Sequence, residues 1–125
     1  MQLKIGKKDY DINLGIRALK YLDDVYYYEE EQSGLRFGVG IELLTTGLSM
    51  GNILAVVNFI KAGTITERSK PSDEDIEEFI GSMTEDEFDN FLEEVKDELK
   101  KQPLTRTKAR QILGDVEKAT KPTKK

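Results

Sequence analysis

The chain has 125 residues, of which 38% are hydrophobic and 34% charged, and 24 acidic residues stand against 19 basic ones. This length and composition predict one domain with a modest core and a largely solvated, helical surface. Because cysteine and histidine are both absent, disulfides, thiolate metal sites, the commonest general base and the commonest zinc ligand are excluded.

The hydropathy of the chain argues against a membrane role. No apolar run approaches the roughly 20 residues of a membrane-spanning helix. The opening residues, MQLKIGKKDY, lack the apolar core of a signal peptide. We therefore expect a cytosolic protein without membrane contact.

Charge is distributed unevenly along the chain. Residues 1–71 carry nine basic and nine acidic side chains, residues 72–102 carry three and thirteen, and residues 103–125 carry seven and two. The acidic block is typical of a solvated helix face, whereas the basic end could bind nucleic acid, dock a partner or pair with the acidic block. Nucleic acid is the weakest of these, because the basic end has no aromatic residue to stack on bases.

The first predicted element is a β-hairpin over residues 2–14. Apolar and polar residues alternate on both sides of Gly6, which places Leu3 and Ile5 on one face of the first strand. An isolated hairpin is marginal in water, so this one must pack on helices.

Residues 15–28 predict the first helix. Its apolar stripe continues to Tyr26, while Tyr27 and Tyr28 are expected to be partly exposed. The segment EEEQSG should end the helix, with Gly34 as a left-handed residue after it.

The stretch GLRFGVG, residues 34–40, suggests a phosphate cradle but does not fit one. Such a loop needs glycines at the first, third and sixth positions, after a strand and before a helix. Here glycines stand first, fifth and seventh, after a predicted helix. We therefore interpret the stretch as the turn of a helix–turn–helix joint.

Exposed aromatic residues around this turn are candidates for partner binding, because they offer contact area at low entropic cost. The simpler alternative is that the rings lie along the end of their own helix. The candidate partner-binding residues are Tyr27, Tyr28, Leu35, Arg36 and Phe37.

Residues 40–63 predict two short helices. The second is apolar around most of its circumference, so it should be the central core helix. A buried strand over ILAVVNFI remains an alternative because of its β-branched residues. Residues 65–71 are expected to form an exposed linker that ends at Pro71.

Two acidic helices should follow, each opened by a capping signature. Ser72 is followed by Asp75, and Thr84 by Glu87. The second helix should end at Pro103. Its buried stripe is predicted to be Phe88, Phe91 or Leu92, Val95 and Leu99.

A last amphipathic helix is predicted over residues 104–119, with Leu104, Ala109, Ile112, Leu113 and Val116 near one side, followed by a disordered tail over residues 120–125. We expect residues 1–102 to form the globular domain and residues 103–125 a basic C-terminal helix and tail. This end could contact the acidic block of another copy head to tail. The candidate assembly residues are Arg106, Lys108, Arg110, Ile112 and Leu113.

The acidic residues do not match a metal or catalytic motif. A calcium-binding loop starting at Asp73 would need glycine at its sixth position and glutamate at its twelfth, but Glu78 and Thr84 stand there. Helical spacing alone defines no pair of catalytic carboxylates. We therefore predict no catalytic residue, metal site or cofactor, and a binding protein rather than an enzyme. The fold should be mainly α, a small N-terminal β-hairpin packed on about five to six short helices.

Over roughly residues 1–100, the chain resembles the tail assembly chaperones of long-tailed bacteriophages, particularly those of Gram-positive hosts. The likeness rests on the order of the hairpin, GIRALKYLDDVY, GLRFGVGIELLTTGL, NILAVVNFIKAGT, KPSDEDIEEFI and the acidic helix. It implies a non-enzymatic protein of the host cytoplasm that binds the tape measure protein, keeps it soluble and is absent from the finished virion. It also implies recruitment of the major tail tube protein, self-association and a longer, frameshifted form.

The alternative is a phage or plasmid regulatory adaptor that binds nucleic acid or a host protein through the basic C-terminal segment. Salt-sensitive retention of DNA by that segment would favour it.

Overall fold

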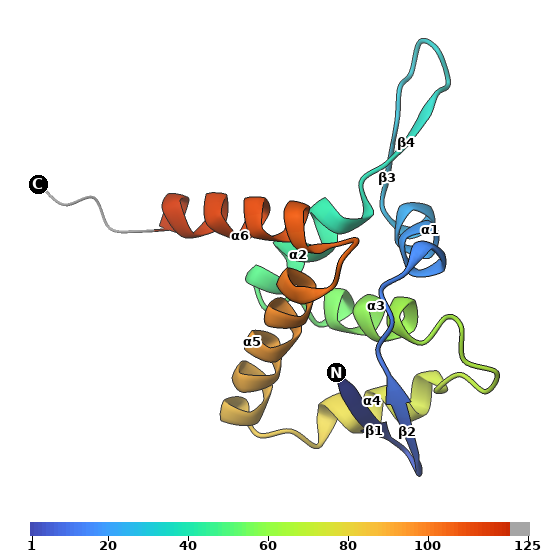
Figure 1. Cartoon of the computed structure of the whole chain (residues 1–125), viewed down its shortest axis with the longest axis vertical. Helices are drawn as coiled ribbons and strands as arrows, with labels where there is room; N and C mark the ends of the chain where they lie inside the picture. The colour runs from blue at the N-terminus through green and yellow to red at the C-terminus, as the bar shows by residue number, and fades with distance from the viewer. Residues whose placement is uncertain (121–125) are drawn as a thin grey trace, which may run out of the picture.

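The computed structural model describes residues 1–120, with side chains through Asp115. As predicted, it is mainly α-helical with a small N-terminal antiparallel hairpin (Figure 1). Its helices are α1 (Ile16–Val25), α2 (Gly40–Ser49), α3 (Ile53–Gly63), α4 (Asp73–Gly81), α5 (Glu85–Lys101) and α6 (Arg106–Thr120). Its strands are β1 (Gln2–Ile5), β2 (Lys8–Asp11), β3 (Tyr27–Glu29) and β4 (Arg36–Gly38).

The N-terminal hairpin is confirmed. Strand β1 pairs antiparallel with β2, so that Leu3 faces Tyr10, and Gly6 adopts φ +65 in the turn. The chain after β2 lies against the end of α3. A Cβ on Gly63 would come within 2.6 Å of Ile12 Cγ2, so this close approach requires glycine.

Helix α3 runs through the core, and the alternative of a buried strand is wrong. The Asn52 side chain accepts a hydrogen bond from the Ala55 N–H and thereby caps the helix. Phe59 is fully buried, whereas the first turn is not covered: Ile53 is 55% exposed and Leu54 is 70% exposed. The helix therefore keeps one apolar side at the surface.

The predicted helix–turn–helix joint is wrong. Helix α1 ends at Val25, and Tyr27 and Tyr28 belong to a strand that pairs with β4. A run of a β-branched residue and three tyrosines favours extended backbone over a further helical turn. Gly34 does have a positive φ of 68, but in the hairpin loop and not at a helix end.

Both acidic helices begin as predicted. The Ser72 side chain accepts a hydrogen bond from the Asp75 N–H, and Thr84 and Glu87 form a reciprocal capping box. Helix α5 ends before Pro103. The buried residues of its stripe are Phe91, Leu92, Val95 and Leu99, with Phe88 half-buried.

Helix α6 packs its beginning on α2 and α5 and then extends away from the body (Figure 1). Ala109 is fully buried, while Leu104 is 53% exposed and does not belong to the packed side as predicted. The predicted disordered tail began at Thr120, but this residue is the last of α6. The side chain of Val116 and residues 121–125 lie outside the described residues. The division of the chain at residue 103 stays a prediction.

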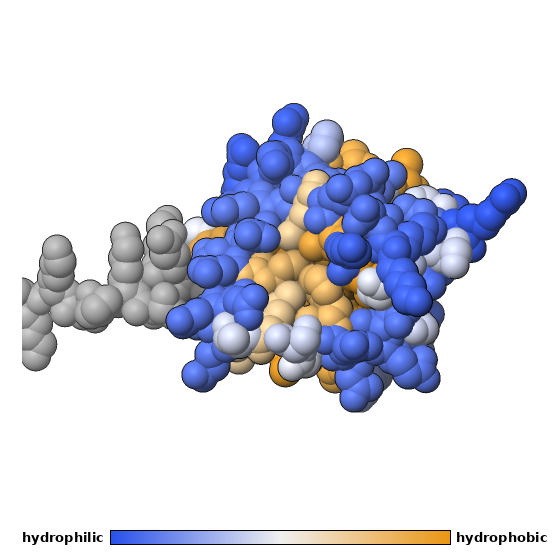
Figure 2. All heavy atoms as spheres, turned by 90° about the horizontal axis from the view of Figure 1, so that it is seen from below, coloured by the Kyte–Doolittle hydropathy of each residue, from blue (hydrophilic) through white to orange (hydrophobic). Residues whose placement is uncertain are grey.

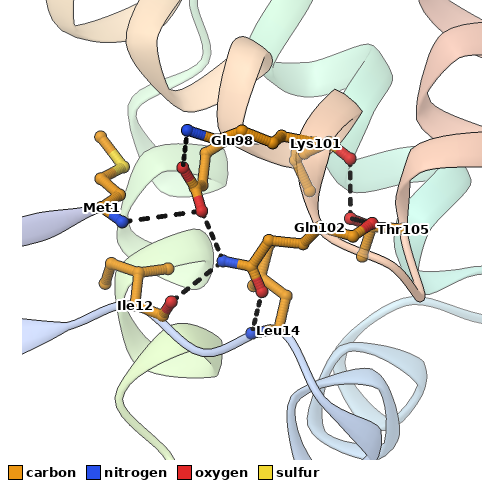
Figure 3. A network of polar contacts seen from close by, with 8 residues as sticks. Met1, Ile12, Leu14, Glu98, Lys101, Gln102 and Thr105 are labelled. Carbon is orange, nitrogen blue, oxygen red and sulfur yellow. Dashed lines mark hydrogen bonds and ion pairs between the residues drawn. The ribbon is translucent and has the colours of Figure 1, made fainter.

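A polar network around Gln102 joins the N-terminal segment to the turn between α5 and α6 (Figure 3). The Gln102 amide donates to Ile12 O at 3.0 Å and to Glu98 Oε2 at 2.7 Å, and it accepts from the Leu14 N–H at 2.8 Å. Glu98 is buried and also pairs with the Met1 ammonium at 3.7 Å. These contacts provide hydrogen-bond partners for the Ile12 carbonyl, the Leu14 N–H and the buried Glu98 carboxylate.

Candidate functional site: the β3–β4 hairpin

The β3–β4 hairpin is the element that projects furthest from the helical body (Figure 1). Its register places Tyr28 opposite Phe37. The pairing continues at both ends of the strands, because the Val39 N–H donates to Tyr26 O and the Glu30 N–H donates to Leu35 O, each at 2.9 Å. The aromatic residues are therefore fixed on an ordered ribbon.

One face of this ribbon carries three exposed apolar residues. Side chains alternate between the two faces of a strand, and cross-strand partners share a face. Tyr28, Leu35 and Phe37 consequently lie together, and they are 59%, 57% and 50% exposed. We call these three residues the hairpin apolar face.

The opposite face holds the other two predicted residues, Tyr27 and Arg36. The Arg36 guanidinium stacks 3.7 Å from the centre of the Tyr27 ring, a cation–π contact. Arg36 Nη2 also donates to Asp24 O at 3.1 Å and lies 3.7 Å from Asp24 Oδ1. The five residues proposed from the sequence are thus close in space but divide between an apolar and a polar face.

The base of the hairpin is fixed by Asp23. Its Oδ1 accepts a hydrogen bond from the Gly40 N–H at 2.9 Å, at the start of α2. A Cβ on Gly38 would come within 2.2 Å of Asp23 Cγ, and one on Gly40 within 2.7 Å of the Leu22 backbone. These glycines serve close packing, and a carboxylate of the chain itself occupies the helix end where an anion would bind.

The candidate assembly residues lie apart from the hairpin, on α6. Arg106, Lys108 and Arg110 are exposed, and Ile112 and Leu113 are half-buried. Figure 1 shows α6 leaving a different side of the body from the hairpin. The two predicted surfaces are therefore separate.

The sequence reasoning missed a groove between α3 and α4. Its volume is about 460 Å³. Lys61 Nζ and Asp73 Oδ1, 2.7 Å apart, lie along it, and their hydrogen bond raises the pKa of Lys61 above its usual value. The apolar residues of the lining are Ile53, Leu54, Val57, Ile76 and Ile80. The sequence contained one indication of this groove, namely the two apolar residues Ile53 and Leu54 at the start of α3.

An apolar area lies on the underside of the molecule, bordered by hydrophilic residues (Figure 2). Helix α4 and the N-terminal hairpin lie on this side in Figure 1. The half-buried hydrophobic residues from the end of α4 to the start of α5, including the turn between the two helices, are packed against the core. They are Phe79, Ile80, Met83 and Phe88.

Within the described part of the chain, no group of three or more acidic residues is arranged to hold a metal ion. No helix in this part is both long and apolar enough to cross a membrane.

A family model described as "Phage tail assembly chaperone protein, TAC" matches residues 2–113. The match includes the projecting hairpin, the α3–α4 groove and most of the described part of α6. No curated protein and no solved structure gives a significant match.

Proposed function

The chain belongs to the family of phage tail assembly chaperones, and on that premise we propose that it binds the tape measure protein, keeps it soluble and promotes assembly of the tail tube around it. The observation that carries this proposal is the family match over residues 2–113. The proposed role is non-enzymatic, takes place in the host cytoplasm and leaves the chaperone out of the finished virion.

The hairpin apolar face is the proposed contact surface for the tape measure protein. A very long helical chain with unburied apolar stripes needs aromatic or apolar surfaces to cover them until assembly. Tyr28 and Phe37 are directly opposite one another, and each is at least half exposed. Rigid rings of this kind are efficient anchors, since few rotamers are lost on binding.

The packing beneath the hairpin supports this role, because it holds the anchors in place before binding. The Asp23 contact to Gly40 fixes the base, and Arg36 braces the polar face against Asp24 and Tyr27. Preorganisation of this kind lowers the entropic cost of association. Many copies along one long partner would add avidity to a weak single contact.

The experiment is a pull-down with an affinity-tagged chain expressed from the phage or prophage genome, read by mass spectrometry. The proposal predicts recovery of a very long helical protein, of the tail tube protein in smaller amount, and of a longer form sharing this N-terminus. Recovery of nucleic acid or an unrelated host protein instead would favour the regulatory adaptor and contradict the proposal.

A further inference from the structure

The α3–α4 groove has the size and lining of a helix-binding site. Ile53, Leu54 and Val57 line it from α3, and Ile76 and Ile80 line it from α4. Leu54 at 70% exposure and Ile53 at 55% exposure continue this apolar lining to the surface. Helices of 11 and nine residues give a groove about 15 Å long.

The rim of the groove is acidic. Asp73 and Glu77 belong to its lining, and Glu74 follows Asp73 in the first turn of α4. Lys61, the basic residue of the lining, is already paired with Asp73. An amphipathic helix with basic residues beside its apolar ones complements this surface in charge.

Helix α6 of the same chain has those features. Arg106, Arg110 and Leu113 follow one another at helical spacing, and Lys108 and Ile112 form the adjacent row. Ile112 and Leu113 are only half-buried, and the basic side chains are exposed. Residues 106–115 span about 15 Å, which matches the length of the groove.

A chain cannot fill its own groove with α6. In its own chain α6 packs on α2 and α5, and Figure 1 shows α6 and α4 well apart. We propose that α6 of one copy docks in the α3–α4 groove of a second copy, with Ile112 and Leu113 against the apolar floor and the basic residues beside the acidic rim. Because groove and helix are different surfaces, the contact is heterologous and builds a ring or an open filament.

The test is the mass of the untagged protein, measured by light scattering over a range of concentrations. The mass should exceed the 14.2 kDa of one chain, rise with concentration and fall as salt increases from about 0.05 M to about 0.5 M. Leu54→Glu in the groove and Arg110→Glu in α6 should each return the mass to that of one chain. Both positions are exposed, so circular dichroism should show an unchanged fold.

Mixing the two variants gives the decisive result. Arg110→Glu keeps an intact groove, and Leu54→Glu keeps an intact α6, so an equimolar mixture should form a dimer of twice 14.2 kDa and nothing larger. Ile16→Glu and Arg17→Glu, exposed positions on α1, are the matched controls and should assemble normally.

A monomeric wild type at every concentration, unchanged assembly of both variants, or a mixture that stays monomeric would each overturn the proposal. Self-association is measured here without the tape measure protein. Failure of this contact is therefore distinguishable from failure of the proposed chaperone role.

Discussion

Replacing Gln102 by glutamate tests whether the polar network sets the stability of the α5–α6 junction. Gln102→Glu keeps the side-chain shape and the acceptor for the Leu14 N–H, but it removes the donor to Ile12 O and Glu98 Oε2. A neutral hydrogen bond contributes about 1 kcal/mol and one to a charged group about 2 kcal/mol. Allowing for partial exposure, the unfolding free energy should fall by about 2–3 kcal/mol.

The assay is thermal unfolding followed by circular dichroism. For a domain of this size the loss corresponds to a fall in Tm of about 8–12 °C near pH 7. Repulsion from Glu98 raises the pKa of the introduced carboxyl in the folded state, so the destabilisation is full above that pKa. It should shrink as the pH falls towards the unfolded-state pKa, because the protonated group regains a donor.

Gln111→Glu, at an exposed position on α6, controls for the added charge and should leave Tm within about 2 °C of the wild type. An equally small change for Gln102→Glu, or a deficit that does not shrink on acidification, would show that the network does not stabilise this junction.

Three further predictions concern single positions. Gly63→Ala should cost about 2 kcal/mol in urea unfolding, since its Cβ meets Ile12 at 2.6 Å, whereas Gly114→Ala, with nothing within 4 Å, should stabilise by about 0.5–1 kcal/mol. Equal effects would contradict the contact. Thr84→Ala should cost about 1 kcal/mol by the same assay, and no loss would show that the cap is not used. The hydrogen bond from the Thr84 backbone N–H lowers the pKa of Glu87, so an NMR titration should place it below an ordinary glutamate; its contribution to stability is present above the unfolded-state pKa and lost as pH falls through the folded one.

Features governed by local chemistry were predictable from the sequence. The turn at Gly6, the caps at Ser72 and Thr84 and the buried stripe of α5 each depend on residues within about one helical turn or one hairpin. The projecting hairpin was missed because Tyr26 fits the helical period of α1. The aromatic run, the Ser33–Gly34 turn and the second run LRF together carried the contrary signal.

Features that depend on contacts between residues distant in the sequence could not be predicted from local sequence patterns. Nothing in the local pattern predicts that Asp23 reaches the start of α2 or that Gln102 joins residues about 90 positions away. The residues of the candidate surface were named correctly as exposed, but their division between two faces requires the strand register. The α3–α4 groove likewise appears only once α4 is placed beside α3.

The most direct test of the account is co-expression of this chain with the tape measure protein of the same phage, measuring how much of the latter stays soluble. Three chains are compared: the wild type, a Tyr28→Ser/Phe37→Ser variant of the hairpin apolar face, and Ile16→Ser/Met50→Ser, at two exposed positions outside the hairpin, as the matched control. The account predicts soluble, co-eluting tape measure protein with the wild type and the control. With the double variant, the affinity for the tape measure protein should fall at least tenfold, about 1.4 kcal/mol in binding free energy, and less of that protein should stay soluble. If the folded double variant keeps the tape measure protein equally soluble, the hairpin apolar face is not its binding surface. If the tape measure protein is insoluble even with the wild type, the chaperone role itself is contradicted.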